Sequence, residues 1–292
     1  MSIKLVLIDT SSMVFDIIFQ SRKEFFNNKK NKELDNFIEN KEFVSILWKN
    51  SEKIIYKIMD KHIVSGNRLY FIRDCSLEKN WRIKIYPLYK GHRKKLIKHN
   101  GNNFDIKNIC IYFYQNILPK IINKINSNSI KISGAEADDI IGAFVIKYHY
   151  LYDIIIISKD HDFIQLLKYK NIKLYSSCGE NIEELLMKKT IYYDDWIKQN
   201  LGHEIRQKIS EEFLLKKIMK GDKSDNINYC INNDIDIYLN NIDLLEILFQ
   251  NNENIKIKFE LNRQLIDFNY IPSYIYKQVD TEFKKINSTY SI

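Results

Sequence analysis

Three short apolar runs, each closed by an aspartate, constrain the fold of this chain more than any other feature. The runs are rich in β-branched and aliphatic side chains, as expected for buried strands. They are Ile3–Ile8, Arg68–Arg73 and Ile154–Ile157. An aspartate follows each run within three residues: Asp9, Asp74 and Asp160. The segments between the runs carry apolar side chains at helical spacing, so the order of elements predicts parallel crossover units.

The predicted fold class is therefore α/β, with a mostly parallel central sheet flanked by helices. A further short strand is expected at 130–132, and helices are expected over 43–59, 106–121 and 135–148. Beyond residue 200 the spacing becomes helical throughout, over 205–219, 237–250, 255–268 and 272–286. We predict an α/β domain over 1–200 and a helical C-terminal lobe over 201–292.

The composition is that of a globular chain, with 45% hydrophobic and 28% charged residues. No apolar run approaches the roughly 20 residues needed to cross a bilayer, and the chain starts in a strand-like run instead of a signal peptide. We therefore expect a cytoplasmic protein that does not contact a membrane. The four cysteines form no Cys-x-x-Cys pair, which argues against a zinc site or a disulfide framework. The net charge of +8 favours a polyanionic partner.

Nine carboxylates stand out as candidate metal ligands. Because ligands in open parallel sheets bind beyond the carboxyl ends of the strands, the aspartates that end the runs are expected to share one crevice. Acidic residues also cluster at three later positions. The full set is Asp9, Asp74, Glu136, Asp138, Asp139, Asp160, Asp162, Asp222 and Asp225. So many carboxylates in one crevice would repel each other unless hard divalent cations such as Mg²⁺ or Mn²⁺ neutralised them.

Each acidic cluster also has a purely structural explanation. Ser133–Glu136 matches a capping box, Asp160 is a suitable N-cap, and Gly221 with Asp222 is suitable for a helix end. The occurrence of all the clusters in order, at strand ends and helix starts, favours the metal site. Two cations about 3.5–4 Å apart can activate water on one side of a phosphodiester and stabilise the leaving oxygen on the other.

Three segments carry a resemblance to a known family. They read GAEADDIIG over 134–142, SKDHDFIQL over 158–166 and MKGDKSDN over 219–226. In this order they resemble the acidic motifs of the 5′-nuclease superfamily, which includes flap endonucleases and the 5′-nuclease domains of bacterial DNA polymerase I. Within it, KGDKSDN and the tail LIDFNYIP over 265–272 look most like the ribonuclease H of T-even bacteriophages. The resemblance spans residues 9 to about 272.

The resemblance implies two cation sites. The first would be held by Asp9, Asp74, Glu136 and Asp138. The second would be surrounded by Asp160, Asp162, Asp222 and Asp225. Asp139 is a further member of the acidic set. The implied cofactor is a pair of Mg²⁺ ions, with Mn²⁺ as a substitute.

A basic segment follows Asp74. Residues 81–95 interleave cations with aromatics, which suits the binding of a single strand through its phosphates and bases, whereas the alternative is a solvated basic loop. In the family this stretch resembles the helical arch, here 75–103. By resemblance, Lys90 and Arg93 would contact the scissile phosphate. The further nucleic-acid contacts would be Arg82, Lys84, Tyr89, Lys94 and Lys95.

One segment departs from the family. Most relatives carry a glycine-rich hairpin between two helices after the last acidic motif, and its main-chain amides hold the duplex backbone. Residues 227–236 contain no glycine and two acids, Asp234 and Asp236. We therefore expect a degenerate hairpin that contributes little to duplex binding.

The sequence thus predicts a Mg²⁺-dependent 5′-nuclease that hydrolyses 5′ flaps, nicked or gapped duplexes and RNA primers on DNA. Lagging-strand primer removal would fit this activity. The expected partners are DNA and RNA–DNA hybrids, with a single-strand-binding protein or clamp as possible replisome partners, and the protein is expected to be a monomer. A PIN-type single-strand ribonuclease and a catalytically weak nucleic-acid-binding scaffold are the alternatives.

Overall fold

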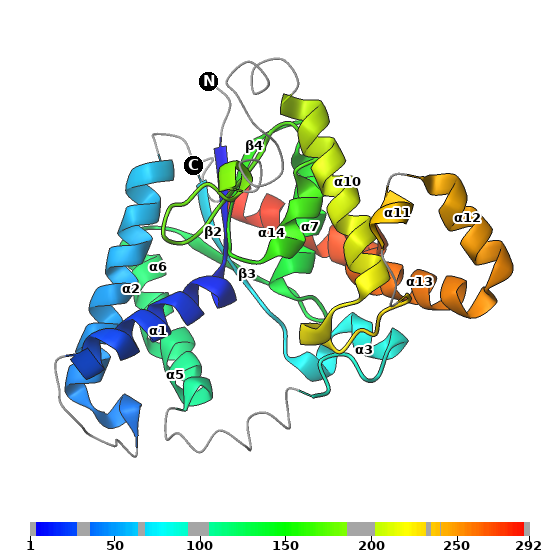
Figure 1. Cartoon of the computed structure of the whole chain (residues 1–292). Helices are drawn as coiled ribbons and strands as arrows, with labels where there is room; N and C mark the ends of the chain where they lie inside the picture. The colour runs from blue at the N-terminus through cyan, green and yellow to red at the C-terminus, as the bar shows by residue number, and fades with distance from the viewer. Residues whose placement is uncertain are drawn as a thin grey trace.

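The computed structural model describes residues 4–27, 36–63, 68–92, 105–185, 202–231, 235–239 and 241–288. Five parallel strands form a central sheet in these ranges (Figure 1). The strands are β1 (Lys4–Asp9), β2 (Arg68–Arg73), β3 (Asn128–Lys131), β4 (Asp153–Ile157) and β5 (Ile172–Tyr175). The described part of the chain therefore has the predicted α/β class, with a sheet that is parallel throughout.

The strand order, β3-β2-β1-β4-β5, places the first strand at the centre. The chain builds outward through β2 and β3 and then returns to add β4 on the other side of β1. Such a reversal leaves a crevice at the carboxyl ends of the strands on either side of it. Both neighbours of β1 lie in parallel register with it, so the ends of β1, β2 and β4 come together.

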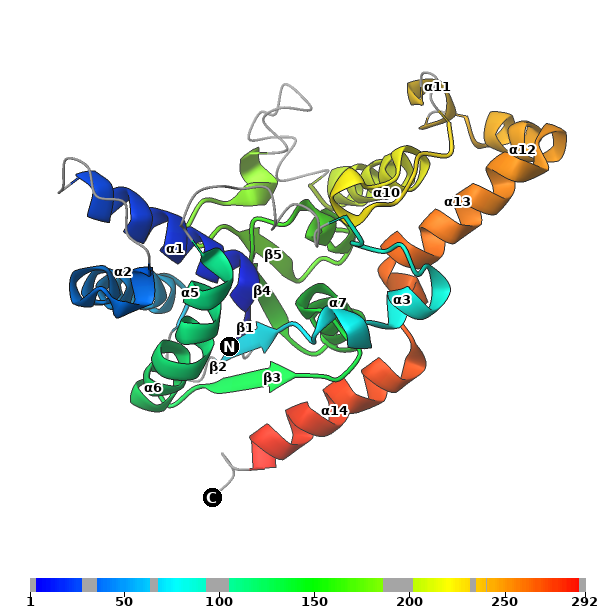
Figure 2. The ribbon, with the colours of Figure 1, turned by 90° about the horizontal axis from the view of Figure 1, so that it is seen from below.

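Helices cover both faces of the sheet (Figure 2). One face is covered by α1 (Thr10–Asn27), α2 (Lys41–His62), α5 (Ile106–Tyr112) and α6 (Leu118–Lys124). The other is covered by α7 (Ala137–Tyr148) and by α14 (Ser273–Ser288), which packs directly against α7. Alternate side chains of each strand enter the two cores, since Leu5 and Leu7 belong to one and Val6 and Ile8 to the other.

A third core joins the later helices to the segment after β2. The helices are α10 (Gly202–Lys220), α11 (Asp236–Leu239), α12 (Ile242–Asn251) and α13 (Glu253–Ile266). They pack with Tyr89, which follows the short helix α3 (Trp81–Ile85). Short turns of helix complete the chain: η1 (Phe37–Glu39), η2 (Leu77–Lys79), η3 (Phe113–Ile117), η4 (His161–Leu166), η5 (Lys223–Asp225) and η6 (Phe268–Tyr270). The base of the predicted arch thus contacts the helical lobe.

Most predicted elements are confirmed, and several details differ. Helix α1 and strand β5 were not predicted from the sequence. The single helix expected over 237–250 is two helices, α11 and α12. The division near residue 200 stays a prediction, although α14 returns to the core of the sheet. None of the helices in the described ranges combines the length and apolarity that a membrane span requires.

Candidate functional site

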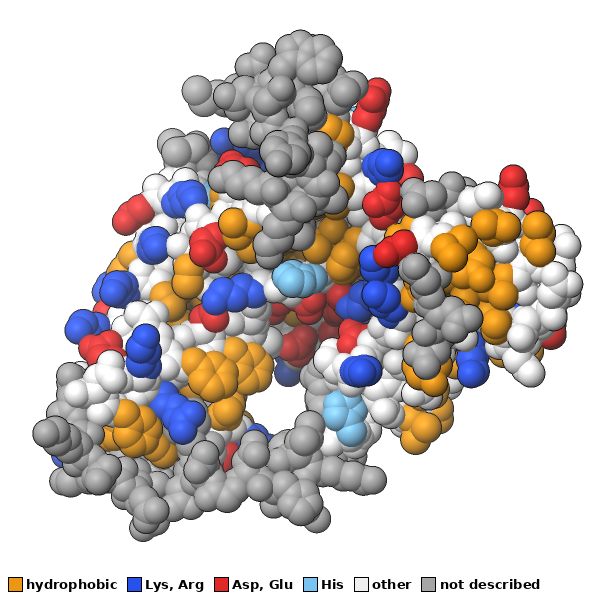
Figure 3. All heavy atoms as spheres, in the orientation of Figure 1, with side chains coloured by type: hydrophobic (Ala, Val, Ile, Leu, Met, Phe, Trp, Pro, Cys, Tyr) orange, Lys and Arg blue, Asp and Glu red, His pale blue; other side chains and the backbone are white. Residues whose placement is uncertain are grey.

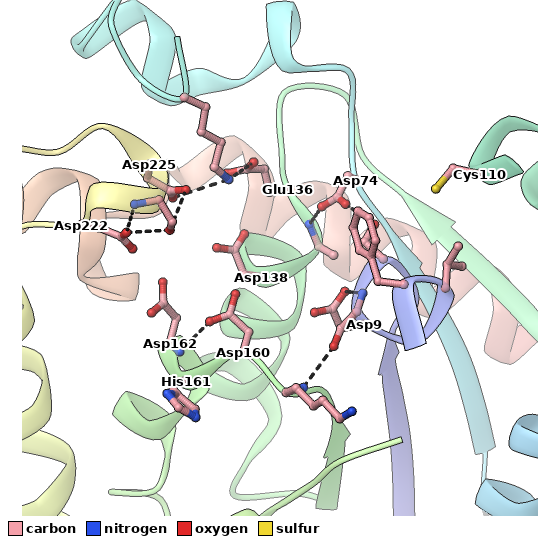
Figure 4. A pocket seen from close by; sticks show the side chains of 18 of the residues that line it. Asp9, Asp74, Cys110, Glu136, Asp138, Asp160, His161, Asp162, Asp222 and Asp225 are labelled. Carbon is pink, nitrogen blue, oxygen red and sulfur yellow. Dashed lines mark hydrogen bonds and ion pairs between the residues drawn. The ribbon is translucent and has the colours of Figure 1, made fainter. Parts of the chain in front are cut away.

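A cavity of about 680 Å³ lies at the carboxyl ends of the central strands. Eight of the nine predicted carboxylates line it and point toward one another (Figure 4). They are Asp9, Asp74, Glu136, Asp138, Asp160, Asp162, Asp222 and Asp225. In the space-filling view, acidic side chains lie at the bottom of a central hollow with basic side chains beside it (Figure 3). The structure therefore brings together all the predicted acids but one.

Local structure explains how each element presents its acid. Asp9 is the last residue of β1, and Asp74 directly follows β2. Asp160 and Asp222 each cap a short helical turn, because their side chains accept from Asp162 N and Ser224 N respectively. The capping and functional explanations are thus compatible for Asp160 and Asp222. The capping box of α7 is formed by Glu136 and Asp139, whereas Ser133 and Glu136 were expected to form it.

The turn before Asp222 depends on a glycine. Gly221 ends α10 with φ +66°, and a Cβ there would lie 2.4 Å from the carbonyl oxygen of Ile227. The backbones of Asp222 and Ile227 bond to each other in both directions, at 2.9 and 2.8 Å. This closed turn holds the last acidic motif at the edge of the cavity. The rest of the predicted hairpin is only partly described, because 232–234 lie outside the described residues.

The strand-end carboxylates form the first cluster. Asp9 accepts hydrogen bonds from Ser158 Oγ at 2.8 Å and from Ser12 N at 3.1 Å. Asp74 accepts from Ser11 Oγ and, at 2.7 Å, from Ala137 N. Among the described residues, no lysine or arginine forms an ion pair with Asp9, Asp74 or Asp138. In the described part of the chain, the negative charges of these three carboxylates are therefore not neutralised by an ion pair.

A lysine that the sequence reasoning missed neutralises the second cluster. Lys217, on α10, donates to Asp162 Oδ1 and lies 2.9 Å from Asp222 Oδ2. Lys217 lies in the last turn of α10, which ends at Lys220, directly before the motif that contains Asp222. No periodicity in the sequence marks it, because its significance depends on an acid 55 residues away.

Asp139 does not line the cavity. Its side chain is completely buried, and it accepts from Trp81 Nε1 at 3.0 Å and from Glu136 N at 2.9 Å. Arg82 approaches both of its oxygens, with Nη1 2.9 Å from Oδ2 and Nη2 2.8 Å from Oδ1. Asp139 also lies close to Glu136 and Asp138. The inclusion of Asp139 among the metal ligands stays a prediction, and its side chain faces Trp81 and Arg82 instead of lining the cavity.

Arg82 was expected to contact nucleic acid, and the structure places its side chain in the interior. Its side chain is 3% exposed, and it also donates to the carbonyl of Leu265 at 2.7 Å. A buried carboxylate requires a counterion, and Arg82 supplies it to Asp139 instead of facing nucleic acid. Arg82 thereby joins α3 to α7 and to the end of α13.

Tyr89 and Lys90 also turn inward. The Tyr89 hydroxyl lies 2.8 Å from Glu136 Oε2 and 2.8 Å from Asp225 Oδ2, so its single proton can bond to either carboxylate, and the ring is buried. Tyr89 was expected to contact nucleic acid, and its burial between two acids leaves no ring face open for a base. Lys90 Nζ lies 2.5 Å from Glu136 Oε1 and 3.5 Å from Asp225 Oδ2. Lys90 therefore lines the cavity, as its predicted role requires.

The remaining arch residues divide into two groups. Lys84 is exposed on α3, where nucleic acid can reach it. Arg93, Lys94 and Lys95 lie outside the described residues, so their predicted roles stay predictions.

Burial and charge set the protonation of the site. Burial, and then the neighbouring Asp74, raise the pKa of Asp9 to about 7. Burial and Asp160 raise the pKa of Asp162 to about 6, although Lys217 opposes them. Burial also acts against ionisation of Glu136, but Lys90 and Arg82 outweigh it and lower its pKa to about 2. The cavity thus holds ionised and protonated carboxyls side by side near neutral pH.

These shifts predict that cation binding depends on pH. A carboxyl with a raised pKa keeps its proton up to that pH, so a cation must displace the proton below it. We expect the affinity of the protein for Mg²⁺ to fall as the pH drops from about 8 to about 6, by up to about tenfold per pH unit for each competing proton. Calorimetric titrations with Mg²⁺ at several pH values, in buffers of different ionisation enthalpy, measure both affinity and proton release. An affinity that does not change with pH would contradict the prediction.

The chain is similar to known proteins. Residues 4–202 match the family model described as 5′-3′ exonuclease, N-terminal resolvase-like domain. A 5′-3′ exonuclease of Buchnera aphidicola subsp. Schizaphis graminum is 29% identical over 177 residues, which are 60% of this chain and 52% of that protein. Ribonuclease H of Enterobacteria phage T4 is 29% identical over 218 residues, which are 67% of this chain and 62% of that protein. The matches thus span between half and two thirds of these relatives.

Solved structures share the fold over nearly the whole chain. A bacteriophage T5 protein co-crystallised with metal ions has 18% identity and a TM-score of 0.59, covering 97% of this chain and 99% of that chain. A bacteriophage T5 flap endonuclease in a complex with DNA and metal ions has 17% identity and a TM-score of 0.60, covering 97% and 98%. The arrangement of sheet and helices is therefore one already seen in solved structures.

Proposed function

The chain belongs to the 5′-3′ exonuclease family, and from this membership we propose that it is a structure-specific, divalent-metal-dependent 5′-nuclease. The observation that carries the proposal is the cavity, where eight carboxylates converge from β1, from the residue after β2, and from α7, η4 and η5 with their N-caps. The reaction is hydrolysis of a phosphodiester, which leaves a 5′-phosphate and a 3′-hydroxyl.

The donor set fits hard divalent cations, because all the candidate ligands are carboxylate oxygens. We assign a first cation to Asp9, Asp74, Glu136 and Asp138. We assign a second to Asp160, Asp162, Asp222 and Asp225. When bound, two such ions, Mg²⁺ or Mn²⁺, would supply an activated water and stabilise charge on the leaving oxygen.

The two lysines of the cavity would have to leave their carboxylate partners before they could bind substrate. Lys90 and Lys217 neutralise Glu136, Asp162 and Asp222 in the protein alone. With cations held by these carboxylates, each ammonium group would be available to a phosphate oxygen. Lys90 would then act on the scissile phosphate with Arg93, and Lys84, Lys94 and Lys95 would bind the strand that enters the site.

The proposed substrates are 5′ flaps, nicked or gapped duplexes, and RNA primers on DNA, since both an exonuclease and a ribonuclease H are among the relatives. This activity would serve lagging-strand primer removal, in the cytoplasm, by a monomer that works beside replisome proteins. The arch over 75–103 and the helical lobe over 201–292 would bind the substrate on two sides of the cavity.

A cleavage assay tests the proposal. The full chain is incubated with an end-labelled 5′-flap duplex, with an RNA primer on DNA and with unstructured RNA, each with Mg²⁺ and with EDTA. Defined 5′ fragments from the flap or primer, formed only with Mg²⁺, are the expected result. A shift in mobility without cleavage would indicate a binding scaffold. Cleavage of unstructured RNA alone would indicate a single-strand ribonuclease.

Lys90 offers a sharper test of the catalytic assignment. We expect Lys90→Ala to lower single-turnover cleavage by roughly 10²–10³ at saturating substrate, because one preorganised donor to the transition state is lost. Binding of the flap substrate should weaken only modestly. The matched control is Lys84→Ala, which removes an exposed lysine of the same segment and should weaken binding with near-normal cleavage at saturation. A Lys90 variant that cleaves at the normal rate once saturated would overturn the assignment.

A further inference from the structure

An irregular helix lies opposite the carboxylates. Between α5 and α6, residues 113–117 form a turn of π-helix. Pro119 provides a local reason, because it has no N–H to donate to the carbonyl of Gln115 and its ring crowds that carbonyl. Turns of π-helix are rare and frequently occur at functional sites. This one carries Tyr114, whose side chain lines the cavity.

Contacts with β2 and α1 hold the side chain of Tyr114 in place. The guanidinium carbon of Arg73 lies 4.7 Å from the centre of its ring. Its hydroxyl lies 3.1 Å from Ser11 Oγ, at the start of α1. Ser11 Oγ in turn donates to Asp74 Oδ2. Because a serine hydroxyl has a single proton, Tyr114 must donate to Ser11, and the hydrogen bonds run in one direction from tyrosine to carboxylate.

This chain of hydrogen bonds defines the orientation of Asp74. Its other oxygen, Oδ1, accepts from Ala137 N at 2.7 Å. Each carboxylate oxygen has two lone pairs, so both donors can stay in place while the remaining lone pairs face the cavity. We propose that Tyr114 is a positioning residue that, through Ser11, holds the Asp74 carboxylate in the orientation needed to bind a divalent cation. This inference rests on the proposed function only in taking Asp74 as a cation ligand.

Removal of the tyrosine hydroxyl should therefore weaken cation binding. Hydrogen-bond partners of metal ligands typically contribute 10- to 100-fold to affinity, and we expect Tyr114→Phe to weaken Mn²⁺ binding by about tenfold. Ser11→Ala should weaken it at least as much. The double variant should match Ser11→Ala alone, because Tyr114 acts only through that serine. The matched control is Tyr112→Phe, which removes a phenol hydroxyl from the same helical segment and should leave the affinity unchanged.

The measurement is the concentration of free Mn²⁺ by electron paramagnetic resonance during titration of the full chain, without nucleic acid. Wild-type affinity in Tyr114→Phe, or losses that add in the double variant, would overturn the inference. A merely structural role would lower the unfolding midpoint in EDTA without changing the Mn²⁺ affinity, and this outcome would overturn it as well.

The same titration separates this inference from the proposed function. A wild-type protein that binds Mn²⁺ but cuts no flap or primer would refute the nuclease, and the effect of Tyr114 on binding would still be measurable. A wild-type protein that cuts flaps while Tyr114→Phe binds Mn²⁺ normally would refute the positioning role alone.

Discussion

Asp74→Asn is expected to abolish cleavage, with a loss on the order of 10³ or more, while leaving nucleic-acid binding largely intact. The amide removes one negative charge from a cluster in which no described lysine or arginine neutralises Asp9, Asp74 or Asp138. It also replaces one carboxylate oxygen with a group that cannot bind a cation. Single-turnover cleavage of a 5′-flap substrate and fluorescence anisotropy in EDTA measure the two effects separately.

The control for this variant is Asp153→Asn. Asp153 begins β4, so the same chemical change is made at the opposite end of the same sheet, where cleavage should stay normal. Asp225→Asn should cost less than Asp74→Asn, because Lys90 and Tyr89 already contact the Asp225 carboxylate. Equal and complete loss of cleavage and binding in Asp74→Asn and Asp225→Asn would contradict the division of the carboxylates into two clusters.

The acids of this site could be predicted from the sequence because local rules place them. Asp9 and Asp74 follow runs of buried strand residues, and the parallel sheet brings those strand ends together. Asp160 and Asp222 begin short helical turns, which is a position that aspartate favours. Such positions depend on a few neighbouring residues, so a pattern in the sequence is enough to identify them.

The partners of those acids could not be predicted in the same way. Arg82 and Tyr89 belong to a segment whose composition is typical of nucleic-acid binding. Both are nevertheless buried against acids that lie between 47 and 136 residues away. Lys217 likewise reaches Asp162 from another element. Whether a basic residue faces solvent or a buried acid depends on tertiary packing, and sequence spacing does not contain that information.

Two regular elements were missed for related reasons. Strand β5 has only four residues, IKLY, at the edge of the sheet. A run that short is difficult to distinguish from a turn in the sequence. Helix α1 starts directly at the end of β1, with the polar residues Thr-Ser-Ser. Its buried residues, such as Met13, Ile17 and Phe25, recur at helical spacing, so the pattern was present in the sequence.

Arg82→Met is expected to lower the free energy of unfolding by about 3–5 kcal/mol, since removing one partner of a buried ion pair leaves the other charge uncompensated. Asp139 is completely buried, and Arg82 is the guanidinium that contacts both of its oxygens. Urea unfolding in EDTA gives the value. The matched control is Lys124→Met, which breaks an exposed pair of 2.7 Å with Glu52 and should leave the free energy of unfolding nearly unchanged.

A second variant shows whether the loss arises from the buried charge. Arg82→Met/Asp139→Asn removes that charge and keeps an oxygen that can accept from Glu136 N, so it should recover part of the lost stability. The penalty of the single variant should also shrink as the pH falls, because burial raises the pKa of Asp139 and a protonated carboxyl needs no counterion. If Arg82→Met costs less than about 1 kcal/mol, or if the double variant is less stable than the single one, Arg82 does not stabilise the protein by neutralising Asp139.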